Sequence, residues 1–221
     1  MSLISPEVVN DYDLSEAKFL SHLIKALNVT GHNPATSGNY SIRSQHEPKI
    51  ALVSESGIDK SLFSESNLLP VTIETGALYS DAYVGRKSSD ETGLHLAVYQ
   101  STDAGCVLHS HLLEGLLFAE LYPKQDVITL TGLELLKGLK GVKTHEASIK
   151  IPVFENSQDI VQLAKDAKTA LKELEGQHAP IFILRGHGFY VWGANVKEAK
   201  RHLEVFEYIF KYFVERKRLA V

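Results

Sequence analysis

The residues best suited to chemistry are two histidines separated by a single residue, His109 and His111. They end a short apolar run that begins at Cys106, which predicts a buried β-strand. Side chains alternate between the two faces of a strand, so both imidazoles point to the same side. Their Cα atoms would lie about 6.6 Å apart at a rise of ~3.3 Å per residue. Two imidazoles at that separation can bind one ion, because zinc takes nitrogen ligands at about 2.0–2.1 Å.

A third histidine, His187, follows another apolar run and lies between Gly186 and Gly188. Glycine allows the backbone to approach a ligand closely. Three histidines with an open coordination position are typical of a catalytic rather than a structural zinc site. The alternative is that each histidine is only a hydrogen-bonded residue at a strand end. The His-x-His spacing together with His187 makes the metal site a hypothesis worth carrying forward.

Two loops of small polar residues adjoin predicted strands. Residues 31–39 combine Gly, Asn, Pro, Thr and Ser before a strand at 40–43, and residues 54–57 follow a strand at 50–53. Backbone N–H groups and hydroxyls in such loops can hold an anion such as phosphate. Lys60 would add a mobile positive charge suited to phosphate. Ordinary turns remain the alternative for both loops.

Glu91 stands at the start of an apolar helix that precedes the histidine strand in the chain. A glutamate in a first helical turn is often only a partner of the helix dipole. Because the next element carries His109 and His111, Glu91 is also placed to supply a carboxylate to the metal. Ser89 lies at the same helix N-terminus, where anions bind. His95 follows Glu91 by one helical turn and therefore lies on the same face.

Hydrophobic periodicity predicts the elements that must position these residues. Helical spacing is found over 14–28, where Asp13 and Glu16 have the separation of a capping box, and again over 157–174 and 196–218. Alternating or continuous apolar runs predict strands. These strands are expected at 40–43, 50–53, 68–73, 149–154, 181–184 and 189–192.

The order of these elements predicts an α/β fold, with a mixed central sheet that carries helices on both faces. The whole chain, residues 1–221, is expected to form a single domain, because no linker, repeat or low-complexity stretch interrupts it. Pro70 places the strand at 68–73 at a sheet edge. Residues 131–138 are expected to form a short helical turn, in which Glu134 faces either solvent or a pocket.

Composition limits the function. The net charge of −4 argues against a nucleic-acid partner, because there is no excess of basic residues to neutralise phosphates. A single cysteine, Cys106, excludes an intrachain disulfide and suits a reducing compartment. No apolar run is long enough for a membrane helix, and the segment Met1–Glu7 lacks the features of a signal peptide. We therefore expect a cytoplasmic protein with no membrane partner.

Taken together, several motifs resemble the class II aldolase/adducin family, over nearly the whole chain from about residue 15 to 215. These motifs are Pro34-Ala35-Thr36-Ser37-Gly38-Asn39, Ser56-Gly57, Ser89-Asp90-Glu91, His109-Ser110-His111 and Arg185-Gly186-His187-Gly188. Within the family, the chain most resembles the dehydratase branch. The stretches that carry this narrower resemblance are 56–60, 133–138, 144–146 with 151–154, and 190–193.

The resemblance implies one divalent ion per subunit, usually zinc, held by His109, His111 and His187. It implies that Glu134 is the catalytic acid/base. Glu91 stands where the aldolases of the family carry an acid/base, whereas this position varies in the dehydratases, so its role stays open. A tetramer with sites near subunit interfaces is also implied. The residues implied to bind the substrate phosphate are Thr36, Gly38, Asn39, Ser56, Gly57, Lys60 and Ser89.

The activity implied by the dehydratase resemblance is loss of water from a phosphorylated ketose, 5-methylthioribulose 1-phosphate, in methionine salvage. Its product would be the 2,3-diketone phosphate. One alternative within the fold is an aldolase of the fuculose 1-phosphate type, with Glu91 as its acid/base. Another is an adducin-like binding module without catalysis; the presence of all three histidines argues against this alternative.

Overall fold

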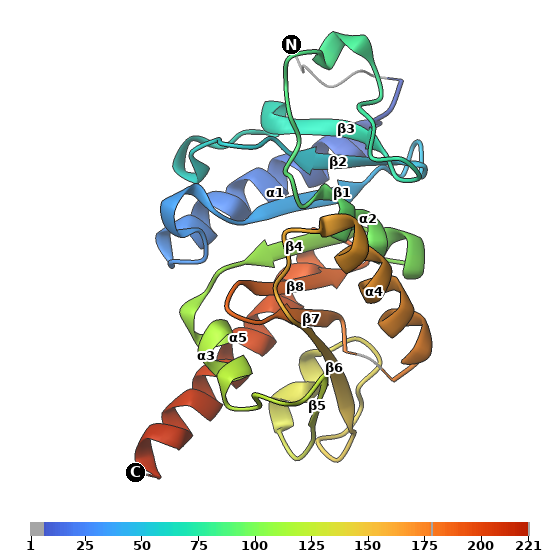
Figure 1. Cartoon of the computed structure of the whole chain (residues 1–221). Coiled ribbons are helices and arrows are strands. Elements are labelled where there is room, and N and C mark those ends of the chain that lie inside the picture. The colour runs from blue at the N-terminus through green and yellow to red at the C-terminus, as the bar shows by residue number, and fades with distance from the viewer. Residues whose placement is uncertain (1–6, 178, 221) are drawn as a thin grey trace.

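The computed structural model of the protein describes residues 7–177 and 179–220. Its strands form one eight-stranded sheet in the order β3-β2-β1-β4-β8-β7-β6-β5 (Figure 1). Neighbouring strands are antiparallel except β6 and β7, so the sheet is mixed, as predicted. The strands are β1 (Asn39–Arg43), β2 (Ile50–Ser54), β3 (Leu68–Thr72), β4 (Cys106–Ser110), β5 (Val127–Leu130), β6 (Ile149–Phe154), β7 (Ile181–Leu184) and β8 (Gly188–Gly193).

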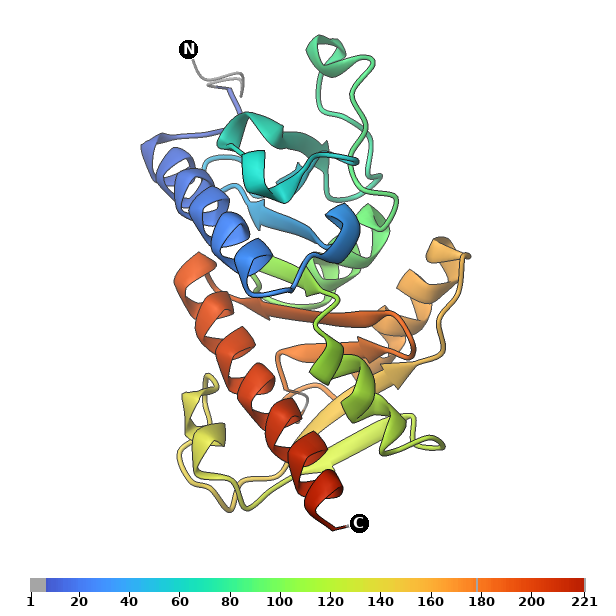
Figure 2. The same ribbon diagram turned by 90° about the vertical axis from the view of Figure 1, so that its left-hand side faces the viewer.

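Helices cover both faces of this sheet, which also confirms the predicted architecture (Figures 1 and 2). Apolar residues of α1, α3 and α5 form one core on one face, and those of α2 and α4 form a second core on the other. The α-helices are α1 (Asp11–Val29), α2 (Thr92–Ser101), α3 (Leu113–Glu120), α4 (Ile160–Glu173) and α5 (Val196–Leu219). Short 3₁₀ helices are η1 (Pro34–Thr36), η2 (Lys60–Leu62), η3 (Glu65–Asn67), η4 (Asp81–Tyr83) and η5 (Glu134–Gly138).

Strand β4 lies near the middle of the sheet, between β1 and β8, and is buried on both faces. Cys106 and Leu108 pack into the core beneath α1 and α5, whereas Val107 packs into the core beneath α2 and α4. This alternation directs His109 to the face of the sheet that carries α2. The same helix begins immediately after Glu91, so the fold brings the carboxylate and the histidine strand together.

The predicted capping box of the first helix is wrong. The helix begins at Asp11, and Asn10 is its N-cap, with reciprocal hydrogen bonds between Asn10 and Asp13. Asp13 is buried, and its carboxylate also accepts the backbone N–H of Gln45, at 2.7 Å, which offsets the cost of burying it. The carboxylate of Glu16 instead accepts the N–H of Val196, the first residue of α5. Both acids therefore join α1 to distant segments.

Other expectations are confirmed. Strand β3, which contains Pro70, lies at one edge of the sheet, and β7 and β8 form an antiparallel pair. Cys106 is a free, buried thiol, and burial raises its pKa. The opposite edge strand, β5, was not predicted.

The opening segment, on which the absence of a signal peptide was judged, lies almost entirely outside the described residues. Across residues 7–177 and 179–220, no helix combines the length and the apolar character required to cross a bilayer.

Candidate active site

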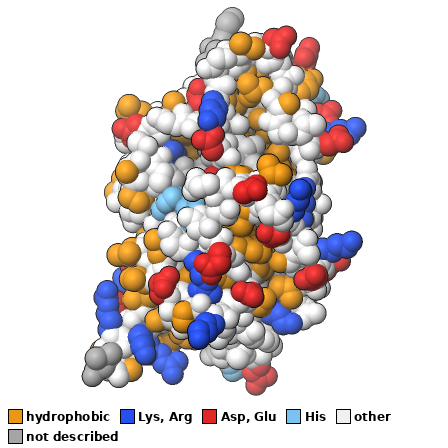
Figure 3. Space-filling view, in the orientation of Figure 1, with side chains coloured by type: hydrophobic (Ala, Val, Ile, Leu, Met, Phe, Trp, Pro, Cys, Tyr) orange, Lys and Arg blue, Asp and Glu red, His pale blue; other side chains and the backbone are white. Residues whose placement is uncertain are grey.

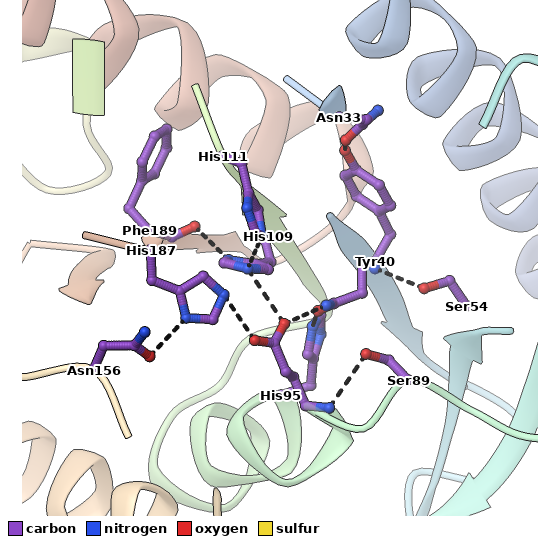
Figure 4. A network of polar contacts seen from close by, with 12 residues as sticks. Asn33, Tyr40, Ser54, Ser89, His95, His109, His111, Asn156, His187 and Phe189 are labelled. Atoms are coloured by element: carbon purple, nitrogen blue, oxygen red, sulfur yellow. Dashed lines mark hydrogen bonds and ion pairs between the residues drawn. The ribbon is translucent and has the colours of Figure 1, made fainter. Parts of the chain in front are cut away.

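Three imidazoles and one carboxylate converge at the ends of β4, β8 and α2. His109 and His111 come from the end of β4, His187 from the turn before β8, and Glu91 from the residue before α2. One potential ligand atom from each of the four lies within 4.8 Å of those of the others. The histidines face one another in the close-up view (Figure 4). The structure thus places His187 beside the His-x-His pair, as the metal-site hypothesis requires.

Glycine at position 188 allows His187 to approach the histidine strand. A Cβ atom on Gly188 would lie 2.3 Å from the carbonyl oxygen of Ser110 and 3.1 Å from the ring of His109. Gly186, which precedes His187, has a φ of +61°, a left-handed conformation that favours glycine. The two glycines therefore serve the tight turn and the close approach on which the cluster depends.

The hydrogen bonds of the outer ring nitrogens fix the tautomers of His109 and His187. Nδ1 of His109 donates to the carbonyl oxygen of Phe189 at 3.0 Å, because a carbonyl can only accept. Nδ1 of His187 donates to the amide oxygen of Asn156 at 3.1 Å. In the neutral imidazole the other nitrogen, Nε2, then carries a lone pair. Both lone pairs point towards the Glu91 carboxylate, Oε1 lying 2.8 Å from His187 and Oε2 lying 3.3 Å from His109.

Burial determines the charges in this cluster. It lowers the pKa of His109 well below its ordinary value and that of His111 to about 4, so both rings are neutral ligands near pH 7. Burial alone would raise the pKa of Glu91, but its contacts with His187, His109 and Asn39 together lower it, so the carboxylate is ionised. The neutral rings of His109 and His111 thus lie beside an anion, an arrangement that a cation between them would satisfy.

The donor set therefore fits a divalent metal ion. Three imidazole nitrogens and a carboxylate are ligands that zinc accepts, and the hydrogen bonds to Phe189 and Asn156 are the outer contacts that orient metal-binding histidines. Tyr190 stacks on the face of the His109 ring, with ring centroids 4.0 Å apart, and this packing limits rotation of the imidazole. Histidine surface reaches the exterior at mid-height on the face seen in Figure 3.

A small polar cavity of about 180 Å³ adjoins the cluster. All the residues predicted to hold phosphate contribute to its wall. It is lined by Thr36, Ser37, Gly38, Asn39, Ser54, Glu55, Ser56, Gly57, Lys60, Ser89, Glu91 and His111.

The loop that forms one side of the cavity has an unusual backbone. Ala35 and Thr36 have φ values of 52° and 65°, in the left-handed region that residues other than glycine rarely adopt. Gly38 is required for space as well, because a Cβ there would lie 2.4 Å from the side-chain oxygen of Asn33. Lys60 is buried and donates to the carbonyl oxygens of Thr36, at 2.9 Å, and Ile58, at 3.2 Å. Its ammonium group thus holds the loop while lining the cavity.

Asn39 differs from the other predicted phosphate residues because its side chain is engaged elsewhere. Its Nδ2 donates to Oε2 of Glu91, and its Oδ1 accepts from Nε2 of His95, both at 2.5 Å. Only its backbone and the edge of its amide remain for a ligand. The connection from His95 through Asn39 to Glu91 was not predicted, although the one-turn spacing of Glu91 and His95 was the signal for it. Asn156 was also missed, and nothing in its loop context singles it out.

Glu134 is not brought to the cluster within this chain. It lies in η5, which packs against α5 on the other side of the sheet, and its side chain is 72% exposed. Lys137 donates to its carboxylate at 2.6 Å, and this hydrogen bond lowers the pKa of Glu134. It lines a separate apolar hollow of about 490 Å³. The other residues of that hollow are Leu133, Leu135, Gly138, Tyr208, Ile209 and Tyr212.

Comparison with known proteins agrees with the resemblance inferred from the motifs. A protein named methylthioribulose-1-phosphate dehydratase in Stenotrophomonas maltophilia is 37% identical over 206 residues, which cover 92% of each chain. A protein of the same name in a Picosynechococcus strain is 34% identical over 202 residues, which cover 91% of this chain and 92% of the relative. A solved L-fuculose 1-phosphate aldolase superposes with a TM-score of 0.76 at 21% identity, covering 98% of this chain and 92% of its own.

A sugar-phosphate aldolase structure from Thermotoga maritima gives a TM-score of 0.72 at 17% identity, with 95% of this chain and 98% of its own covered. These two structures share the fold. The family model described as the class II aldolase and adducin N-terminal domain matches residues 20–214. This chain therefore belongs to the class II aldolase/adducin family.

Proposed function

We propose that the protein is a zinc-dependent dehydratase that converts 5-methylthioribulose 1-phosphate into 2,3-diketo-5-methylthiopentyl 1-phosphate in the methionine salvage pathway. The observation that carries the proposal is the junction of the histidine cluster with the small polar cavity, at the position where His111 and Glu91 line both. Relatives that share 34–37% identity along almost the full chain bear the name of this activity. The protein would act in the cytoplasm with one Zn²⁺ per subunit.

The cavity would anchor the substrate by its phosphate. Hydroxyl groups of Thr36, Ser56 and Ser89, with the backbone N–H groups of the glycines, offer donors to phosphate oxygens. Lys60 would add a positive charge. Anchoring one end of the ketose fixes the distance of its reacting carbons from the histidine cluster, which turns phosphate binding into positioning.

The chemistry requires a proton acceptor and a means of stabilising charge on the substrate carbonyl. A divalent cation held by His109, His111 and His187 would supply Lewis-acid stabilisation of that charge. We assign the proton transfers to Glu134, which removes the C3 proton and assists departure of the C4 hydroxyl as water. The resulting enol becomes the diketone by tautomerisation. Hydrogen bonding to Lys137 lowers the pKa of Glu134, which keeps the carboxylate ionised but makes it a weaker base in the single chain.

Glu134 can serve this role only from a second copy of the chain, because in its own chain it lies on the other side of the sheet from Glu91. The surface around it suits such a contact. Tyr208, Tyr212 and Leu135 beside it are 64%, 42% and 39% exposed, and exposed apolar patches of this kind mark interfaces. A homotetramer in which one subunit supplies the histidines and another supplies Glu134 satisfies both placements.

The first experiment is incubation of zinc-loaded protein with 5-methylthioribulose 1-phosphate, followed by trapping with o-phenylenediamine, which condenses with vicinal diketones. Formation of the trapped diketone without carbon–carbon cleavage would support dehydration. A zinc-loaded, folded protein that yields no diketone contradicts the proposal. His187→Asn is the matched inactive control, because it removes one of the three imidazoles that would hold the metal.

Complementation between inactive variants tests the shared site. His111→Ala and Glu134→Gln are each expected to abolish turnover. Mixed oligomers that contain both should recover about one quarter of wild-type activity, because one in four random subunit pairings restores an intact site. No recovery in oligomers shown to be mixed would place Glu134 outside the partner's site.

One observation favours a second candidate function, a retro-aldol cleavage of a sugar 1-phosphate. Glu91 lies directly against His109 and His187, where an acid/base for carbon–carbon cleavage would be needed. Production of dihydroxyacetone phosphate from fuculose 1-phosphate, with no diketone from the methylthio sugar, would select this activity.

A further inference from the structure

A chain of buried hydrogen bonds runs behind the cluster, away from the cavity. It starts at the Glu91 carboxylate and passes through Asn39 to His95, whose Nδ1 lies 2.7 Å from the hydroxyl of Ser41. The same Ser41 hydroxyl lies 2.7 Å from the hydroxyl of Tyr99. His95 and Tyr99 come from α2, whereas Asn39 and Ser41 come from β1, so the chain spans the contact between that helix and the sheet.

The carboxylate at one end sets the direction of every bond. The NH₂ group of Asn39 donates to a Glu91 oxygen, so the same amide turns its oxygen to His95. Nε2 of His95 must then donate to Asn39, which leaves Nδ1 with a lone pair that accepts from Ser41. Ser41 in turn accepts from Tyr99. Each group donates towards Glu91, and one orientation of the Asn39 amide satisfies them all.

Burial of the groups fixes the direction of donation along this chain of hydrogen bonds. His95 is completely buried, and burial lowers its pKa to about 4, so the ring stays neutral with one donor and one acceptor. Tyr99 is also buried, and its pKa is raised well above the ordinary value, so its hydroxyl keeps its proton to donate. Reversing any member would leave a buried polar group unpaired, which costs about 1–3 kcal/mol.

We propose that His95 is a positioning residue, which acts through Asn39 to hold the Glu91 carboxylate against His109 and His187. Without His95, the Asn39 amide can rotate and Glu91 loses a hydrogen bond that both orients it and favours its charge. This inference rests on the proposed metal centre, and it adds the chain that supports Glu91 to the groups that set metal affinity. Outer contacts of this kind change metal affinity by about 10- to 100-fold.

The test is zinc affinity, measured by competition with a chelator, in a set of variants that includes a double-mutant cycle. His95→Leu removes both ring nitrogens and should weaken zinc binding about 10- to 100-fold. His95→Gln retains a donor that can reach Asn39 and should recover most of this loss. In the Glu91→Gln background, His95→Leu should change the affinity little, because the group through which His95 acts is already altered.

A matched control is His202→Leu. His202 is another buried histidine with both nitrogens bonded, to the carbonyl oxygen of Trp192 and the N–H of Lys140, but it has no link to the cluster. Its loss should lower thermal stability and leave zinc affinity unchanged. Should His95→Leu fail to fold, Tyr99→Phe removes only the first donor of the chain and should produce a smaller loss that also depends on Glu91.

The outcomes separate the two proposals. Wild-type protein that binds no zinc overturns the metal centre and this inference with it. If the wild type binds zinc but His95→Leu lowers affinity equally with and without the Glu91 carboxylate, His95 acts by packing alone, and only this inference falls. An affinity that His95→Leu leaves unchanged overturns it in the same way.

Discussion

Replacing Ala35 by glycine should make the protein more stable and its anion cavity weaker. Ala35 has φ 52° and ψ 43°, and Thr36 follows with φ 65°, so two successive residues that carry Cβ atoms are left-handed. The side chains of both are exposed, so packing in the core does not force this conformation. The hydrogen bonds that hold it come from Ser37 N–H to the carbonyl of Pro34 and from Lys60 to the carbonyl of Thr36.

The size of the effect follows from two opposing free energies. A left-handed residue other than glycine costs roughly 1–2 kcal/mol, which glycine relieves. Glycine also increases the entropy of the unfolded chain, which costs about 0.5–1 kcal/mol. We therefore expect Ala35→Gly to raise the free energy of unfolding by about 0.5–1 kcal/mol.

Urea unfolding at a fixed protein concentration measures this change, as a higher midpoint at constant slope. Ala26→Gly is the matched control, because Ala26 is exposed within α1 and its replacement should lower stability by about 1 kcal/mol. The more flexible loop should also bind inorganic phosphate less tightly, since ordering it now costs more on binding. If Ala35→Gly destabilises the protein as Ala26→Gly does, the reasoning from backbone strain is refuted.

Three further predictions concern the metal, the charges and the packing. Chelation should lower the thermal midpoint of the wild type, and zinc should restore it, whereas His111→Ala should respond to neither, as differential scanning fluorimetry can show. Glu55→Gln should cost about 1.5–3 kcal/mol at pH 7, because Arg86 donates to both carboxylate oxygens. Hydrogen bonding to Arg86 lowers the pKa of Glu55. This contribution to stability is therefore fully present above the ordinary pKa of 4.5 and should disappear as the pH falls through the lowered pKa of the folded protein. Urea unfolding at several pH values across that range would measure the loss. Gly188→Ala should lower the free energy of unfolding by about 1–3 kcal/mol and weaken zinc binding, because the added Cβ would clash with the carbonyl oxygen of Ser110. A variant that binds zinc as tightly as the wild type would contradict this.

The periodicity of the sequence was sufficient to predict much of this fold. Strands and helices with long apolar patterns, such as α4, α5 and the β7–β8 pair, were expected close to where they occur. The His-x-His pair could be oriented because side-chain alternation on a strand is a local geometric rule. Strand β5 escaped prediction because it is a four-residue edge strand in which only Ile128 and Leu130 are buried. So short an alternation is weak evidence for a strand.

The parts of the site that could not be predicted depend on contacts between distant segments. The pairing of Asn39 with Glu91 joins residues 52 positions apart, and that of His109 with Phe189 joins residues 80 apart. Which nitrogen of His109 carries a proton is decided by that carbonyl, which sequence patterns do not encode. The residues around the cavity were found because they lie in loops with recognisable composition, whereas the chain through Ser41 and Tyr99 consists of residues that look like ordinary members of a strand and a helix.

The structure also bears on which carboxylate can act as a base. Both oxygens of Glu91 already face ring nitrogens or the Asn39 amide, and those contacts lower its pKa, so it is a poor proton acceptor near pH 7. Glu134 makes no contact with the histidine cluster of its own chain, and its side chain is exposed to solvent. Hydrogen bonding to Lys137 lowers its pKa in the single chain, but covering it by a second subunit would desolvate the carboxylate and raise its pKa. A base becomes more effective as its pKa approaches the working pH. Assembly would therefore create both the complete site and a better base, so dissociated subunits should keep zinc affinity while losing dehydration, and a monomer with full turnover would refute this account.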